Sequence, residues 1–269
     1  MIIFKSIDDL NKKIKLTRNI GFVPTMGALH KGHVSLINKS KIKSDKTLVS
    51  IFVNPKQFNN KKDYLKYPRN ISRDIKLLKK HKVDYVLIPK YKDIYKSNYK
   101  FHISIPNNLK VMCAKYRPGH FEGVLNIINI FLSKIRLKYI FLGEKDYQQL
   151  FLIKRFVKNR YKTEVIACKT IRHENLRPYS SRNTLLQKRD LKKLDKISKI
   201  LKKFKSDLKT KKKGVDDLKL IKSKIKENKV RIEYLEIRNK NSLKKIFSKN
   251  NLKIFIAYYI KKVRIIDNF

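Results

Sequence analysis

The chain has few cysteines, few turn-forming residues and no tryptophan. Its 269 residues include two cysteines, seven glycines and seven prolines. Cys113 and Cys168 have no short spacing between them, which excludes a disulfide-rich scaffold and a cysteine-based metal site. We therefore expect a reducing cytoplasm as the compartment. Because glycine and proline are so scarce, a segment that gathers several of them marks a turn with a specific purpose.

Long apolar runs are also missing. The sequence holds no stretch of about 18 apolar residues, the length that crosses a bilayer, and the N-terminal MIIFKSIDDLNKK lacks the apolar run of a signal peptide. We expect no membrane segment. With 42% hydrophobic residues, the chain still has enough apolar side chains for a real core, in one large domain or two smaller ones.

Acidic residues are scarce as well. The chain carries 68 Lys and Arg against 21 Asp and Glu, a formal net charge of +47. Such a charge attracts nucleic acid, but the lysines are spread along the whole chain, as a genome rich in A and T would produce. No signature of a nucleic-acid-binding fold accompanies them. We predict no specific nucleic-acid partner, although anionic small substrates would be drawn to this surface.

Hydrophobic patterning divides the chain into two parts. In the first part, strands are predicted at 19–25, 47–55, 83–89, 138–146 and 163–171, and helices at 33–42, 71–82 and 124–135. This alternation predicts a Rossmann-like parallel sheet with helices on both faces, over residues 1–170.

The second part, residues 171–269, predicts a smaller α+β lid domain. Lysine-rich stretches with Leu and Ile at helical spacing run from about Leu185 to about Asn228. Three strands are then predicted, at 230–239, 251–260 and 261–268. The lysine runs are typical of solvated helix faces without chemistry.

The scarce turn residues gather in PTMGALHKGH, residues 24–33. The pattern predicts a strand, a glycine loop and a helix whose first turns hold His30, Gly32 and His33. This places the loop at the carboxyl edge of the sheet, where the positive end of a helix dipole suits phosphate. Histidines three apart share a helix face and can contact one phosphate group. The alternative is two helix-face histidines without a role, and the preceding PTMG favours the functional interpretation.

Several motifs together carry a family resemblance. PTMGALHKGH resembles the HxGH signature of the nucleotidyltransferase superfamily. Followed in order by SIFVNPKQF, YPRN, RPGHFEGV, FLGEKDYQQL and SSRN, it resembles the pantothenate synthetase (pantoate:β-alanine ligase) family over nearly the whole chain. The resemblance implies that ATP and pantoate form a pantoyl adenylate and pyrophosphate, with Mg²⁺ assisting. β-Alanine then gives pantothenate and AMP. It also implies a homodimer through the first domain.

The resemblance assigns residues to each substrate. Those expected to contact ATP are Met26, Gly27, His30, Gly32, His33, Gly143, Lys145, Asp146, Ile171, Tyr179, Ser180, Ser181 and Arg182. Those expected to bind pantoate or β-alanine are Asn54, Gln57, Gln149 and Arg117. The expected catalytic residues are His30, His33, Lys145 and Arg182. No metal ligand is assigned.

For some of these residues, a structural role is the alternative to substrate binding. The amides of Asn54 and Gln57 could satisfy loop backbone, and Arg117 could be a structural arginine at a helix start. Of the two serines in SSRN, Ser181 is the expected helix N-cap if the loop has no role in ATP binding.

The chain departs from the family just before SSRN. The family has Asp-Gly-Leu-Ala there, whereas residues 172–179 read RHENLRPY, with Asn175 and Leu176 in place of Asp-Gly. The change removes the residue best able to adopt a positive φ angle. Loop closure and ATP affinity are therefore open questions.

Two other functions are compatible with parts of the sequence. A transferase that moves a nucleotide onto a phosphorylated small molecule would share the fold, but two neutral glutamines suit a compact hydroxy acid better than a phosphate. A nucleic-acid-binding protein without catalysis would account for the charge and the altered loop. We favour the ligase.

Overall fold

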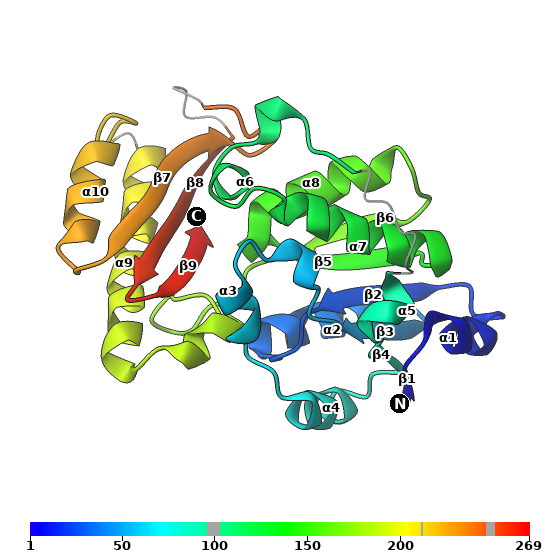
Figure 1. Ribbon diagram of the computed structural model, residues 1–269. Coiled ribbons are helices and arrows are strands. Elements are labelled where there is room, and N and C mark those ends of the chain that lie inside the picture. The colour runs from blue at the N-terminus through cyan, green and yellow to red at the C-terminus, as the bar shows by residue number, and fades with distance from the viewer. Residues whose placement is uncertain (96–102, 211, 246–250) are drawn as a thin grey trace.

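The first part of the chain forms a six-stranded parallel sheet (Figure 1). The computed structural model describes residues 1–95, 103–210, 212–245 and 251–269. The strand order is β1-β4-β3-β2-β5-β6, with parallel pairing throughout. The strands are β1 (Ile2–Phe4), β2 (Ile20–Thr25), β3 (Lys46–Ile51), β4 (Tyr85–Leu87), β5 (Tyr139–Gly143) and β6 (Glu164–Cys168). The predicted parallel sheet is confirmed.

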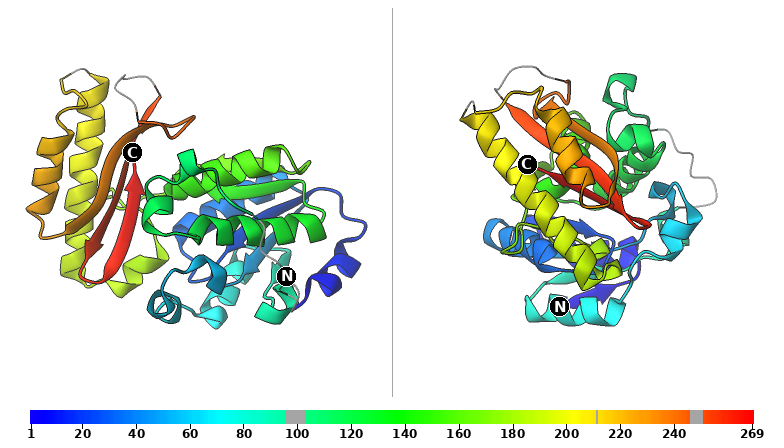
Figure 2. Two further views of the ribbon diagram at one scale, coloured as in Figure 1. Left: turned by 45° about the horizontal axis from the view of Figure 1, so that its top comes forward. Right: turned by 90° about the vertical axis from the view of Figure 1, so that its left-hand side faces the viewer.

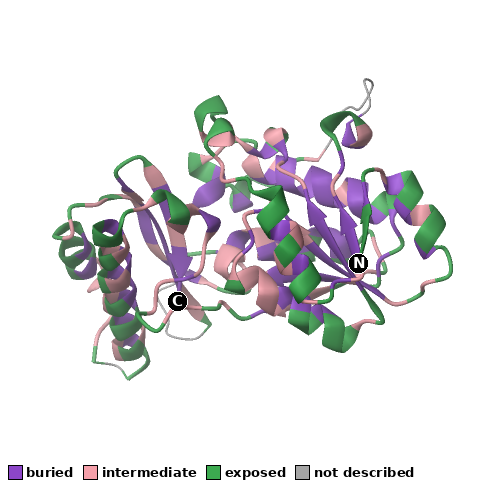
Figure 3. Ribbon diagram, turned by 90° about the horizontal axis from the view of Figure 1, so that it is seen from below, coloured by how far each residue is buried: buried purple, intermediate pink, exposed green. Residues whose placement is uncertain are grey.

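Helices cover both faces of this sheet. They are α1 (Ile7–Ile14), α2 (Lys31–Lys43), α3 (Lys61–Leu65), α4 (Ile71–Lys80), α5 (Tyr91–Ile94), α6 (Cys113–Tyr116), α7 (His120–Lys134) and α8 (Tyr147–Lys158), with short 3₁₀ turns η1 (Pro55–Gln57), η2 (Asn107–Leu109) and η3 (Glu144–Asp146). Side chains of β2 alternate between two cores. Phe22 packs with α1, α7 and α8, whereas Val23 packs with α2 and α4. Figure 3 shows the strands mostly buried and the outer helix faces exposed.

The order in which the chain adds strands to the sheet reverses at β2. This strand pairs with β3 on one side and with β5 on the other. From β2 the chain continues through β3 and β4 toward one edge, and later through β5 and β6 toward the other. In open α/β sheets, ligands bind at the carboxyl ends of the strands where the order reverses. The crevice between β2 and β5 is therefore the place for a ligand.

The second part of the chain forms a three-stranded antiparallel sheet, β7-β8-β9. Its elements are η4 (Ser181–Leu185), α9 (Lys188–Lys209), α10 (Leu218–Lys226), β7 (Arg231–Asn239), β8 (Leu252–Ile260) and β9 (Val263–Asn268). One face packs on α9 and α10. From the other face, Tyr234 and Phe255 join the core of the first sheet, so the two parts lie side by side (Figure 2). The three predicted strands are confirmed, and the boundary near residue 170 stays a prediction.

Several predicted strands are too long: the strand expected at 138–146 ends at Gly143, and the strand expected at 163–171 ends at Cys168. The strand expected at 47–55 ends at Ile51, because Asn54 caps the turn η1 and Pro55 occupies its first position. No helix among the described residues is both long enough and apolar enough to span a membrane.

Candidate active site

A cavity of about 290 Å³ opens where β2 and β5 diverge. Walls come from both sheets and from the segments that follow β2, β3, β5 and β6. All the site residues expected from the sequence line this cavity except Gly27. The structure therefore gathers residues from six separate motifs at the reversal of strand order.

The loop after β2 is held by a carboxylate from α4. Gly27 and Ala28 have φ angles of +79° and +50°, and the Asp74 carboxylate accepts the N–H groups of Ala28 and Leu29, each at 2.8 Å. Burial raises the pKa of Asp74, although these two bonds oppose the rise. Gly27 thus shapes the loop from behind the cavity. Sequence reasoning missed Asp74, because its position in a helix gives no sign that it is buried.

The sequence pattern placed His30 in the first turn of the helix, but in the structure His30 is the N-cap of α2. Its φ and ψ angles are −146° and 175°. His30 Nδ1 accepts the N–H of Gly32 at 3.1 Å, and His33 Nδ1 accepts the N–H of His30 at 3.3 Å. The two rings still lie together, with centroids 4.1 Å apart. Because Nδ1 is the acceptor in both rings, a neutral ring carries its proton on Nε2.

Both histidines are neutral at physiological pH. Burial, together with His33 and Lys145, lowers the pKa of His30 to about 2. Burial also lowers the pKa of His33 to about 4, with Lys145 adding to the effect. Each ring therefore acts as an N–H donor without bringing a positive charge of its own, which suits hydrogen bonding to a phosphate oxygen.

Lys145 supplies the cation at this end of the cavity. It follows β5 in the turn η3, and its Nζ lies 3.1 Å from Asp146 Oδ1. The carboxylate holds the ammonium group near the histidines. The positive charge of Lys145 helps to lower the pKa values of both histidines. This end of the cavity thus combines two neutral donors with the ammonium group of Lys145.

The amides of the NPKQF motif have different contacts. Asn54 Oδ1 accepts Lys56 N–H at 3.2 Å and the Tyr95 hydroxyl at 3.0 Å, and its Nδ2 donates to Gly123 O at 3.1 Å. Asn54 therefore shapes the turn, while Gln57 reaches Met26 Sδ in the cavity wall. Gly123 on α7 lets η1 approach closely, since a Cβ there would collide with the Lys56 carbonyl. Sequence reasoning did not single out Gly123.

The two glutamines of DYQQ also differ. Gln148 is buried, accepts Cys113 N–H at 3.0 Å and donates to Val111 O at 2.8 Å. Gln149 lines the cavity, and within the described part of the chain its side chain has no hydrogen-bond partner. Gln149 is therefore the amide available to a substrate.

Arg117 lies in a cationic region at the opposite wall. It donates to His120 Nε2 at 3.1 Å and to Gln57 O at 3.2 Å, and His120 Nδ1 donates to Gln57 O at 2.7 Å. Burial, with Arg182 and Arg264 nearby, lowers the pKa of Arg117 to about 10, so it remains protonated. Among the described residues, no carboxylate forms an ion pair with it, which leaves room for an anion.

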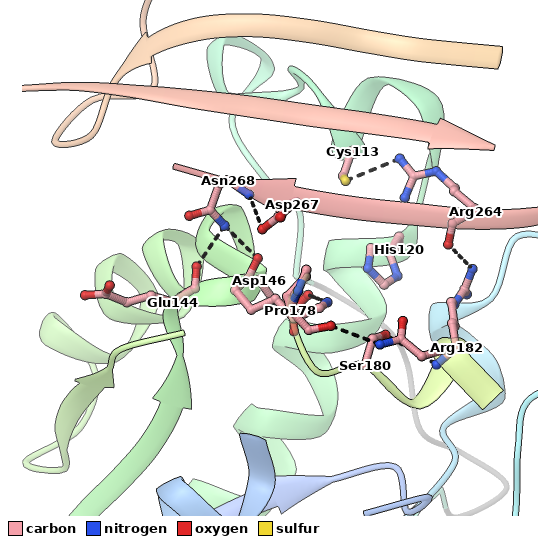
Figure 4. A network of polar contacts seen from close by, with 12 residues as sticks. Cys113, His120, Glu144, Asp146, Pro178, Ser180, Arg182, Arg264, Asp267 and Asn268 are labelled. Atoms are coloured by element: carbon pink, nitrogen blue, oxygen red, sulfur yellow. Dashed lines mark hydrogen bonds and ion pairs between the residues drawn. The ribbon is translucent and has the colours of Figure 1, made fainter. Parts of the chain in front are cut away.

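Arg264 of β9 was not anticipated from the sequence. Its guanidinium pairs with Glu233 and lies 3.4 Å from the Cys113 sulfur, and it lines the cavity (Figure 4). Burial lowers the pKa of Arg264, but Cys113 and the Glu233 carboxylate together raise it above its usual value. No sequence signal pointed to it, because its partners come from a distant strand and helix.

The SSRN loop closes the cavity from the second part of the chain. Ser180, rather than Ser181, caps η4, because its hydroxyl accepts Arg182 N–H at 3.3 Å. Ser181 donates instead to Ala28 O at 3.0 Å. Arg182 pairs with Asp63 on α3 at 2.8 Å and donates to Arg264 O at 3.3 Å. The guanidinium is therefore held at the wall by a carboxylate.

The altered loop forms a tight turn with a leucine in the left-handed region. Leu176 has a φ angle of +70°, which costs a non-glycine residue about 1–2 kcal/mol. Its N–H donates to His173 O at 2.8 Å. Arg177 Nη1 donates to both carboxylate oxygens of Asp195 on α9, at 2.8 and 2.9 Å, and the rings of Tyr179 and His173 stack with their centroids 3.7 Å apart. Side-chain contacts thus hold the turn that a glycine would otherwise favour.

Comparison with known proteins identifies the family. The family model described as pantoate-beta-alanine ligase matches residues 2–269. The chain belongs to the pantoate–β-alanine ligase family. Pantothenate synthetase of Francisella philomiragia is 41% identical over 100% of this chain and 97% of its own length. The corresponding protein of Francisella tularensis subsp. novicida is 38% identical over 98% of this chain and 94% of its own.

Solved structures agree with this membership. Pantothenate synthetase from Thermus thermophilus superposes with a TM-score of 0.94 at 29% identity, covering 100% of this chain and 99% of its own. Pantoate-beta-alanine ligase from Francisella tularensis, complexed with beta-gamma ATP and beta-alanine, has a TM-score of 0.86 at 39% identity and covers 100% and 97%. As a pantoate–β-alanine ligase, the chain joins pantoate to β-alanine to give pantothenate.

Proposed function

We propose that the ligation proceeds through a pantoyl adenylate, with pyrophosphate released in the first step and AMP in the second. The observation that carries this proposal is the pair of neutral histidines at the start of α2, with their Nε2 protons free of the backbone. Donors of this kind stabilise the charge that develops on phosphate oxygens as pyrophosphate leaves.

ATP would bind along the crevice between β2 and β5. Its phosphates would contact the N-terminus of α2, His30, His33 and Lys145. Arg182 would exchange Asp63 for a phosphate, since a guanidinium pairs with either anion in the same two-pronged geometry. Closure of the SSRN loop would then shield the adenylate from water.

The acid and the amine would bind toward the opposite wall. Among the residues that the structure describes, nothing bonds to the amide of Gln149, which is available to the hydroxyl groups of pantoate, and Gln57 lies beside Met26 in the same cavity. Arg117 would take the carboxylate of β-alanine, because it is a half-buried cation whose hydrogen bonds among the described residues go only to neutral groups. The relative from Francisella tularensis was crystallised with both beta-gamma ATP and beta-alanine, which supports a shared cavity.

Mg²⁺ would accompany the ATP phosphates. Within the described segments, no group of three or more His, Cys, Asp or Glu side chains is placed to hold a metal. Mg²⁺ commonly binds through one or two carboxylates, water and substrate phosphates. Asp146 fits this pattern, since it lines the cavity and its side chain is 45% exposed. Bound there, the ion would neutralise phosphate charge.

We also propose a cytoplasmic homodimer. Both cysteines are free thiols, as a reducing compartment would leave them, and the dimer is the assembly that the family resemblance implies. Light scattering coupled to size-exclusion chromatography measures the mass directly. A mass close to that of one chain, 32.1 kDa, across concentrations would contradict the dimer.

The mechanism is tested by pantoate-dependent exchange of labelled pyrophosphate into ATP, with β-alanine absent. We expect exchange in the wild type and a loss of at least about 100-fold in His33→Ala, because one donor to the transition state disappears. His81→Ala is the matched control, since His81 follows α4 outside the cavity. Near-normal exchange by a folded His33→Ala protein would refute the role of this histidine.

A further inference from the structure

Asn268, near the end of the chain, reaches from the second sheet into the turn that carries Lys145. Its Nδ2 donates to the carbonyl oxygens of Glu144 at 2.9 Å and Lys145 at 2.7 Å. Asn268 is only 4% exposed, so water does not compete for these bonds. Figure 4 shows the side chain pointing from β9 toward the turn at Glu144. Both donors of one amide are thus spent on two successive carbonyls of η3.

The neighbouring Asp267 holds the other segment assigned to ATP. Its carboxylate accepts two bonds from the Arg172 guanidinium, each at 2.8 Å. Arg172 also donates to Leu176 O at 2.8 Å, in the turn that leads to the SSRN loop. The N–H of Asn268 donates to Asp267 Oδ1 at 2.8 Å. The end of β9 therefore contacts the turn η3 and the altered loop at the same time.

We propose that Asn268 is a positioning residue for Lys145 and that, with Asp267, it fixes η3 relative to the loop before Ser180. Two bonds from one planar amide set the orientation of the peptide groups from which the Lys145 side chain starts. The side chain itself is restrained by its ion pair with Asp146, which cannot fix the main chain. A displacement of about 1 Å at a reacting group can cost about 100-fold in rate.

This inference rests on the proposed contact between Lys145 and ATP, and the experiment separates the two. Pyrophosphate exchange is measured for Asn268→Asp and Asn268→Ala, each alone and combined with Lys145→Met. Asn268→Asp keeps the shape but turns an oxygen toward two carbonyls, whereas Asn268→Ala removes the donors without repulsion. Thermal midpoints are recorded for every variant.

The expected result is a loss of about 10- to 100-fold in kcat/KM for ATP in either single variant. In the Lys145→Met background, the same change should cost less than about twofold, because the group that it positions is gone. Asn228→Asp is the matched control. Its amide also donates to two carbonyls, those of Lys224 and Ile225 at 3.2 and 3.3 Å, on α10 away from the cavity.

Three outcomes overturn the inference. Normal exchange by Asn268→Asp and Asn268→Ala, with Lys145→Met impaired, removes the positioning role and leaves the contact between Lys145 and ATP standing. An equal loss in both backgrounds shows that the effect does not pass through Lys145. Normal exchange by Lys145→Met refutes the contact with ATP itself, and the inference with it. If Asn268→Asp fails to fold, Asn268→Ala gives the same comparison.

Discussion

Two segments approach the end of the cavity where we propose that ATP binds, and they are held by different means. The segment 24–33 is shaped by main-chain hydrogen bonds, a glycine at positive φ and one buried carboxylate, Asp74. The loop 172–182 is held by side chains: Arg177 pairs with Asp195, and Arg172 pairs with Asp267. The shape of the first segment depends on a few particular residues, so few substitutions can preserve it. The second can absorb substitutions, provided that new side-chain contacts replace the lost turn geometry.

The largest effect is expected from breaking the first segment. Asp74→Ala leaves the N–H groups of Ala28 and Leu29 buried without an acceptor, at a cost of about 1–3 kcal/mol for each group. The loop before His30 would then lose its shape. We expect a lower thermal midpoint and a loss of at least about tenfold in pyrophosphate exchange. Asp84→Ala is the control, because Asp84 also accepts a backbone N–H, that of Thr47 at 2.9 Å, but lies outside the cavity. Equal exchange by the two variants would contradict this prediction.

A smaller effect is expected from restoring the turn in the second segment. The double change Asn175→Asp with Leu176→Gly places glycine at a φ angle of +70° and removes about 1–2 kcal/mol of strain. We expect a lower KM for ATP and unchanged exchange at saturating ATP, because the loop closes more easily while the groups on the first sheet stay in place. Steady-state kinetics over a range of ATP concentrations measures both quantities. An unchanged KM would show that the side-chain contacts fully compensate for the leucine.

Near neutrality the effect of pH is expected to be the smallest of these, and it grows as the pH falls below about 6.5. The pKa of His33 falls from 6.5 in the unfolded chain to about 4 in the folded protein. Below pH 6.5 the unfolded chain binds a proton that folded His33 does not. The stability difference between wild type and His33→Ala should therefore be constant above about pH 6.5 and fall, to the disadvantage of the wild type, from there toward pH 4. Urea unfolding at a series of pH values measures this difference. A difference that does not change over this range would mean that His33 titrates alike in both states.

The sequence predicted the parallel sheet because strands and helices depend on local hydrophobic patterns, whereas the residues that line the cavity were predicted from the family resemblance of its motifs. Helix α4 has strong hydrophobic periodicity and β2 is a short, almost continuously buried apolar run, so both could be predicted from the local sequence. Strand β1 was not predicted, because it is three residues long and two of them are exposed. Helix α8 was not predicted either, because it follows η3 without a glycine or proline to mark its start.

Residues that act through distant partners could not be found from the sequence. Asp74 lies 46 positions from Ala28, and Asn268 lies 123 positions from Lys145. A carboxylate or amide that will be buried has the same local pattern as one that will be exposed. The cap formed by His30 was wrongly placed inside the helix, because helix boundaries shift by one or two residues without changing the periodicity.

The cap at the start of α2 also affects how much order ATP must impose on its site. His30 and His33 are fixed by bonds to the main chain of the same helix turn. Their rotamer freedom is lost when the protein folds, before any nucleotide arrives. Ordering a mobile side chain at a binding site costs about 0.5–1.5 kcal/mol. For these two rings, which we propose contact ATP, that cost lowers the stability of the fold and does not lower the affinity for ATP.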